Sequence, residues 1–205
     1  MTQTIRLSIV LAINLFMITG LIVVGFSSHS ISVLAAGGDY AADAGAIGLG
    51  LIAIMLQGKS PKYHKATSYV ALINGLFLLI ITSFVIYEAG HRLLSQTTPI
   101  VAGLQTMLIS GLAAIAMVVA ALVLRSGDDT RSDLHIRSVM LDTAADASSA
   151  GAVAVTGAII YLTHGFYWLD SIIGLSIGVV IGIAAVKLLH DVAIDFKRNA
   201  NKVGP

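Results

Sequence analysis

The chain of 205 residues contains no cysteine, only three prolines and few charged residues, which make up 11% of it. Without cysteine there is no disulfide framework, no thiolate nucleophile and no cysteine-liganded zinc site. A soluble domain is ordinarily about one quarter charged, so a chain this poor in charge cannot cover its surface in water. A net charge of +1 also gives no basic footprint for nucleic acid. We therefore expect a protein that is solvated by lipid.

Apolar residues are abundant instead: 57% of the chain is hydrophobic and its mean hydropathy is +0.91. A membrane-spanning helix needs about 20 mostly apolar residues, and a helix satisfies its own backbone in lipid. We predict an all-α, multi-pass protein of the cell (inner) membrane, with one six-helix transmembrane domain (1–192) and a short cytoplasmic tail (193–205). The six spans are expected at about 5–26, 32–57, 66–90, 98–124, 136–162 and 169–191.

The first span resembles a signal peptide in position, but we interpret it as a retained helix. Its apolar run, Ile9 to Phe26, exceeds the core of about 7–15 residues that a signal peptide uses. Of the 12 Lys and Arg residues in the chain, all except Arg92 fall on one side of the predicted spans. The positive-inside rule makes that side cytoplasmic, so both termini are expected in the cytoplasm.

Two of the predicted spans carry a pair of aspartates, Asp39 with Asp43 and Asp142 with Asp146. An i, i+4 spacing places both carboxylates of a pair on one helix face. At about 1.5 Å per residue, the pairs lie roughly 9–16 Å into their spans from opposite ends, so in antiparallel helices they meet near mid-membrane. Ionisable groups at this depth are costly and mark function, and no Lys or Arg lies there to neutralise them. We predict that the four carboxylates bind a divalent cation, with protons replacing it when it leaves.

Several motifs, taken in order, resemble the cation diffusion facilitator family of divalent-metal transporters. They are the segment from His29 to Asp43, Val85 to Leu93, Ser132 to Arg137, the D-x-x-x-D of 142–146, and Tyr167 to Ile173. The resemblance implies a six-helix transporter that exports metal from the cytoplasm by alternating access and proton antiport. It also implies a tetrahedral metal site on the second and fifth helices, which by position is made of Asp39, Asp43, Asp142 and Asp146.

Two considerations, the chemistry of oxygen ligands and the family resemblance, bear on which metal an all-carboxylate site prefers. Oxygen ligands suit harder ions such as Mn²⁺, Fe²⁺ or Co²⁺, but Zn²⁺ also accepts carboxylates in four-coordinate geometry, and the resemblance places zinc or cadmium first. The expected partners are divalent cations, protons and the lipid bilayer, with no cofactor besides the transported ion. We expect a short form without the family's C-terminal cytoplasmic domain, which leaves a homodimer open.

Two alternatives remain for the function. The aspartates would also suit a passive cation channel with rings of carboxylates, or a non-transporting membrane protein in which they are structural. The chain contains no G-x-x-x-x-G-K-[ST] phosphate loop and no H-E-x-x-H motif. We therefore predict that it is not an enzyme and does not use ATP.

Charged residues outside the two aspartate pairs have structural interpretations. Glu88 and Arg92 are spaced i, i+4, which predicts an ion pair within one helix. Asp170 begins the sixth span, where a carboxylate is favoured at a helix N-terminus. We predict that it caps that helix rather than handling ions.

Four further polar residues could assist the predicted metal site. Ser149 and Tyr40 are within reach as hydrogen-bond donors that orient the ligands. His64 and His135 lie toward the cytoplasmic side. The pattern alone leaves open whether either histidine takes part in the entry of metal or protons.

Overall fold

The computed structural model describes residues 3–55, 62–95, 98–125 and 134–201, and every regular element within these ranges is an α-helix. Only the backbone is described at 3–4, 49–50, 52–55, 62–68, 70, 124–125, 134–142 and 195–201. The helices are α1 (Gln3–Ser27), α2 (Ile31–Met55), α3 (Lys62–Leu94), α4 (Gly103–Arg125), α5 (Leu134–Thr163) and α6 (Trp168–Asn201). They match the six predicted spans one to one, so the all-α prediction is confirmed.

The helix ends differ from the predicted spans where polar residues or proline intervene. α4 begins at Gly103 rather than at 98, because Pro99 has no backbone N–H and restricts the residue before it. The backbone N–H of Ala102 instead donates to the carbonyl oxygen of Ser28 at 3.0 Å. α3 and α6 are longer than predicted, because helices continue through charged residues that end an apolar run. α6 is helical as far as Asn201, within the segment that we assigned to the tail.

Within the described residues, five helices are long and apolar enough to cross a membrane: Ile5–Ser27, Ala71–Leu94, Gly103–Val123, Thr143–Thr163 and Trp168–Ile194. α2 is the remaining helix, and it is the one that holds both Asp39 and Asp43. Large hydrophobic side chains cover the outside of the bundle, among them Phe16, Phe84 and Leu162, which are 74%, 53% and 75% exposed. Such a surface requires lipid, and the chain is therefore a multi-pass membrane protein.

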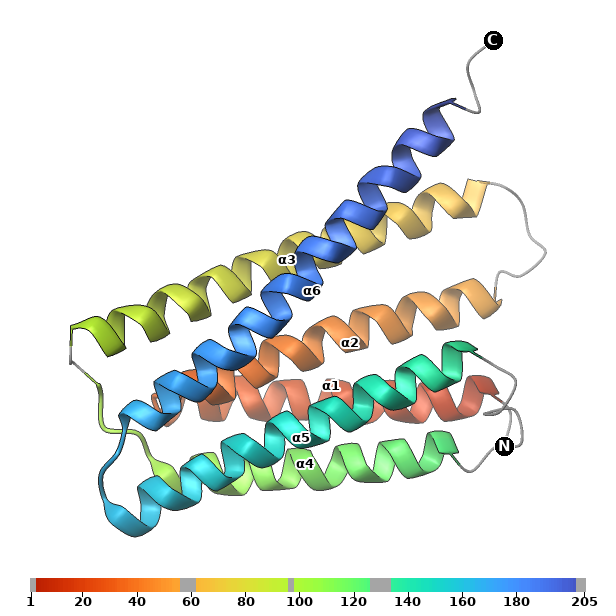
Figure 1. Cartoon of the computed structure of the whole chain (residues 1–205). Coiled ribbons are helices and arrows are strands. Elements are labelled where there is room, and N and C mark those ends of the chain that lie inside the picture. Colours follow the sequence, from red (N-terminus) through yellow and green to blue (C-terminus); the bar gives the residue numbers. More distant parts are fainter. Residues whose placement is uncertain (1–2, 56–61, 96–97, 126–133, 202–205) are drawn as a thin grey trace.

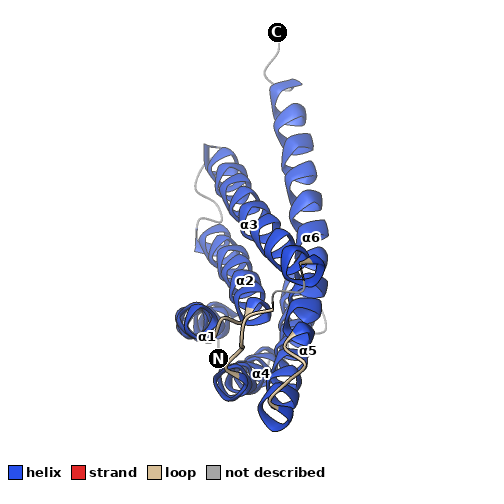
Figure 2. Cartoon of the chain, turned by 90° about the vertical axis from the view of Figure 1, so that its left-hand side faces the viewer, coloured by secondary structure: helices blue, strands red, loops and turns tan. Residues whose placement is uncertain are grey.

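The six helices form two groups, as Figures 1 and 2 show. α1, α2, α4 and α5 lie together, while α3 and α6 cross each other on the other side of α2. The most extensive packing joins α4 to α5, α3 to α6 and α1 to α2, and α2 also contacts α3, α5 and α6. α2, which carries one of the aspartate pairs, thus packs against helices of both groups. α1 begins and α6 ends at the same end of the bundle (Figure 1).

Separate apolar clusters hold these groups together. The central cluster joins α1, α2, α4 and α5 through Met17, Leu21, Val33, Tyr40, Ala113, Met117, Ala150 and Val153. On the other face of α2, Ile31 and Ala35 pack with Val85 and Ala89 of α3. Burial in these clusters fixes the rotation of α2, and hence the direction in which its aspartates project.

Candidate metal centre

α2 supplies the first aspartate pair from the middle of the bundle. Asp39 and Asp43 are both partly buried and lie one turn apart, on either side of Tyr40 in the chain. The Tyr40 side chain is fully buried in the central cluster. The residues around the pair are mainly alanine and glycine, which let neighbouring helices approach closely.

α5 supplies the second pair. Asp146 is only 5% exposed, and the neighbouring Thr143 is 4% exposed, so this face of α5 points into the protein. Asp142 lies one turn earlier on the same helix, but its side chain is outside the described residues. The hydroxyl of Ser149 donates to the backbone carbonyl oxygen of Asp146 at 3.0 Å. It therefore serves its own helix rather than a carboxylate, unlike the donor role that we predicted.

The described aspartates of the two helices converge electrostatically on Tyr40. The carboxylates of Asp39, Asp43 and Asp146 are all near enough to interact electrostatically with its hydroxyl. The prediction that α2 and α5 bring their aspartates into one region is consistent with this arrangement. Among the described side chains, however, no group of three or more His, Asp or Glu is placed to hold a metal ion. The four-residue site includes Asp142, so the complete set stays a prediction.

A polar residue of α3 fixes the backbone of α2 beside this region. Asn74 Nδ2 donates to the carbonyl oxygen of Ala42 at 3.3 Å, one residue before Asp43. A Cβ atom added at Gly45 would lie 2.6 Å from Asn74 Oδ1, so the glycine makes room for the amide. Asn74 is not among the functional residues predicted from the sequence. The feature that could have identified it is a single amide side chain within the apolar run 71–81.

The N-terminus of α2 is capped by a carboxylate from α6. Asp170 is fully buried, and it accepts hydrogen bonds from the Ser30 hydroxyl at 2.6 Å, the Ile31 N–H at 2.7 Å and the Ser32 hydroxyl. The Ser30 hydroxyl oxygen in turn accepts the N–H of Val33 at 3.2 Å, as an N-cap residue does. Asp170 thus caps α2, whereas we predicted that it caps its own helix, α6.

The predicted ion pair in α3 is confirmed, and it has a further partner. Arg92 Nε lies 2.8 Å from Glu88 Oε1. Arg92 Nη1 also donates to the carbonyl oxygen of His29 at 2.9 Å. His29 lies in the α1–α2 turn with a φ of 56°. Together with the Asp170 cap, this bond ties the start of α2 to both α3 and α6.

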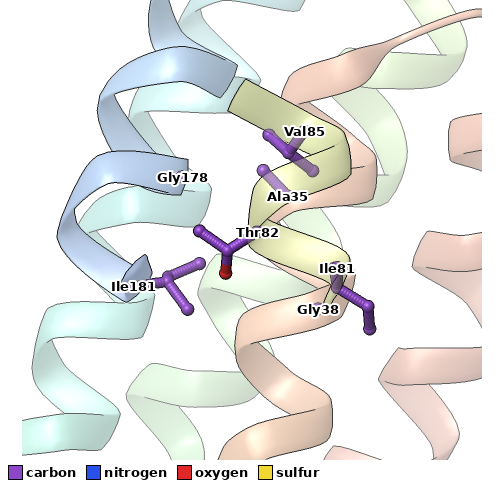
Figure 3. Close-up of a pocket in the computed structure, with 7 residues that line it drawn as sticks. All are labelled: Ala35, Gly38, Ile81, Thr82, Val85, Gly178 and Ile181. Carbon is purple, nitrogen blue, oxygen red and sulfur yellow. The ribbon is translucent and has the colours of Figure 1, made fainter. Parts of the chain in front are cut away.

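A narrow pocket lies where α3 and α6 cross α2, next to the aspartate region. It is lined by Ala35, Gly38, Ile81, Thr82, Val85, Gly178 and Ile181 (Figure 3). The Thr82 hydroxyl is the polar group among these side chains, and it has no hydrogen-bond partner within the described part of the chain. No ionisable side chain lines the pocket, so it is a seam of small residues between helices rather than a metal site. The side chains of His64 and His135 lie outside the described residues.

Ionisable side chains inside a membrane bundle mark a functional site, and an ion pathway is one such function; here they are Asp39 and Asp43 on α2 and Asp146 on α5. Comparison with known proteins agrees: residues 7–194 match the cation efflux transmembrane domain. The chain belongs to the cation efflux family, which is a family of transporters and not of enzymes. The resemblance inferred from the motifs is thereby confirmed.

Three relatives illustrate the similarity. The chain is 33% identical over 172 residues to the "cadmium, cobalt and zinc/H(+)-K(+) antiporter" of Bacillus velezensis, covering 78% of this chain and 54% of the relative. The protein of the same name in Bacillus subtilis is 30% identical over 183 residues, covering 84% and 58%. The zinc transporter ZitB of Yersinia pestis is 29% identical over 194 residues, covering 91% and 60%. The chain thus spans little more than half the length of these relatives.

Proposed function

We propose that the protein exports a divalent metal ion, Zn²⁺ or Cd²⁺ first, from the cytoplasm in exchange for protons. The observation that carries the proposal is that the buried Asp146 of α5 and the partly buried Asp39 and Asp43 of α2 all lie near the same residue, Tyr40. The names of the relatives, which include zinc transporters and cadmium, cobalt and zinc antiporters, support the same cargo. In this proposal the cytoplasmic side holds both termini, and the protein lies in the cell inner membrane.

Electrostatics supplies the reason for coupling metal to protons. Several carboxylates held together inside a membrane repel one another, and each is costly to keep charged there. A divalent cation relieves this cost, and so does protonation, but a given carboxylate oxygen cannot bind both at once. Binding of one cargo therefore favours release of the other. Asp39, Asp43, Asp142 and Asp146 would be the ligands, and rocking of the helices would expose them to each side in turn.

The proposal is tested by metal flux into proteoliposomes that contain a metal-sensitive dye. Zn²⁺, Cd²⁺, Mn²⁺, Co²⁺ and Fe²⁺ are each added outside, with wild type and with Asp146→Asn. We expect saturable uptake by wild type, and at least about a tenfold loss in the variant, because loss of a direct ligand should exceed the effect of losing a partner of a ligand.

Asp191→Asn is the matched control for this experiment. Asp191 also lies within a helix, but its side chain is 65% exposed, and its partner is the equally exposed His190 at 3.8 Å. The control should transport as wild type does. Uptake that rises linearly with concentration would favour a channel instead, and undiminished uptake by Asp146→Asn would reject the aspartate site.

A further inference from the structure

Tyr40 is a side chain of α2 that lies near Asp39 and Asp43 of its own helix and near Asp146 of α5. Its side chain is fully buried, and its hydroxyl has no hydrogen-bond partner within the described part of the chain. Buried hydroxyl groups are nearly always hydrogen-bonded, and an exception calls for an explanation. Because the aromatic ring occupies the interior of the central cluster, the hydroxyl cannot turn out to water for a partner.

Tyr40 belongs to an apolar cluster that contains side chains from all four helices of its group. Met17 and Leu21 come from α1, Met117 from α4 and Val153 from α5, and all belong to the same cluster. Burial of the ring in this cluster restricts the movement of its hydroxyl. On α5, Ala150 belongs to the cluster and Ala147 packs against it, so the buried Asp146 that precedes Ala147 lies beside this part of the protein. Its carboxylate is near enough to Tyr40 to interact with it electrostatically.

We propose that Tyr40 is a positioning residue for the metal site: its hydroxyl donates a hydrogen bond to the carboxylate of Asp146 and orients that carboxylate toward the metal. A phenol has one proton to donate, whereas an ionised carboxylate accepts at several lone pairs. Asp146 can therefore bind a cation through one oxygen and accept from Tyr40 at the other. This inference rests on the proposed function, and it adds a bond between α2 and α5 that forms when the metal draws the two helices together.

Tyr40→Phe tests this role, because it removes the hydroxyl and keeps the ring. Binding of ZnCl₂ to the purified full-length chain in detergent is measured by calorimetry, and thermal unfolding is measured on the same preparation. Hydrogen-bond partners of metal ligands typically contribute about 10–100-fold to affinity, so we expect zinc to bind at least about tenfold more weakly. The unfolding temperature should stay the same or rise, because a buried hydroxyl without a partner has been removed.

Two further samples separate the possible outcomes. Tyr87→Phe is the matched control. Tyr87 is 69% exposed on α3, so loss of its hydroxyl should leave the zinc affinity unchanged. Asp146→Asn reports on the site itself. If wild type binds no zinc, or Asp146→Asn binds as well as wild type, the proposed function fails.

If those two samples behave as proposed but Tyr40→Phe binds zinc within about twofold of wild type, the role of Tyr40 alone is overturned. It is also overturned if the affinity falls together with the unfolding temperature, because that result describes a packing residue. A second readout uses the infrared difference spectrum between zinc-bound and zinc-free protein. The carboxylate bands should shift in Tyr40→Phe, and identical bands in the two proteins would contradict the proposal.

Discussion

A carboxylate buried inside a membrane protein must find hydrogen-bond donors or cations, and Asp170 obtains donors from a helix far away in the sequence. Its oxygens accept from Ser30, Ile31 and Ser32 at the start of α2. Hydrogen bonds to a charged acceptor are stronger than those between neutral groups. A single side chain of α6 therefore fixes where α2 begins. It thereby also fixes the depth of Asp39 and Asp43 in the bundle.

Asp170→Ala should lower the free energy of unfolding by about 2–4 kcal/mol, since it leaves buried donors without an acceptor. Unfolding by increasing SDS in mixed micelles measures the change. Asp191→Ala, at an exposed position of the same helix, should change stability by less than about 1 kcal/mol. Equal effects of the two variants would mean that the cap contributes nothing.

The residues that could be predicted from the sequence are those whose partners lie on the same helix. The i, i+4 spacing of Glu88 and Arg92 gives their ion pair directly. The D-x-x-x-D pairs likewise reveal two aspartates on one face. Asp170 could not be matched to its partners, because a contact across 140 positions leaves no local pattern. Asn74 was missed for the same reason, since its partner is a backbone carbonyl of α2.

At the scale of elements, the closest helix packing is between α4 and α5, where two glycines face each other's backbone. A Cβ atom added at Gly157 would lie 2.5 Å from the backbone nitrogen of Met107 and 2.9 Å from the carbonyl oxygen of Gly103. No side chain can yield there, because the obstructing atoms are backbone. This contact sets the position of α5, which carries Asp142 and Asp146, relative to the rest of the bundle.

Gly157→Ala should therefore separate α4 from α5 and destabilise the protein by about 1–3 kcal/mol, as overpacking does. The same SDS titration measures the change. Gly151 is the matched control on the same helix, because a Cβ atom there meets nothing within 4 Å. Gly151→Ala should be neutral or stabilising by up to about 1 kcal/mol, since alanine has the higher helix propensity. A Gly157→Ala variant as stable as the control would refute the close contact.

The helices themselves could be predicted because each span is an apolar run of sufficient length. The residues at which the helices begin and end were predicted less accurately: α4 begins late, after Pro99, and α6 continues to Asn201. The crossing of α3 and α6 outside the other four helices (Figure 2) could not be predicted either. It depends on tertiary contacts such as those of Leu78 with Ile181 and Ala185.

At the scale of the whole molecule, α2 lies between two groups of helices that are joined to it differently. The central cluster holds it to α1, α4 and α5, and Ile173 and Ile177 of α6 also pack against that cluster. α3 contacts another face of α2, at Ile31 and Ala35. The aspartates of α2 and α5 thus belong to the four-helix group.

The most direct test of the whole account is to record metal entry and proton exit together in one preparation of proteoliposomes. Each vesicle contains a zinc-sensitive dye and a pH-sensitive dye, and Zn²⁺ is added outside to wild type, Asp43→Asn and the control Asp191→Asn. We predict that zinc entry makes the interior more alkaline in wild type and in the control, and that Asp43→Asn loses both signals together. Zinc entry without any movement of protons, or equal signals from Asp43→Asn, would contradict a metal/proton antiporter built on these aspartates.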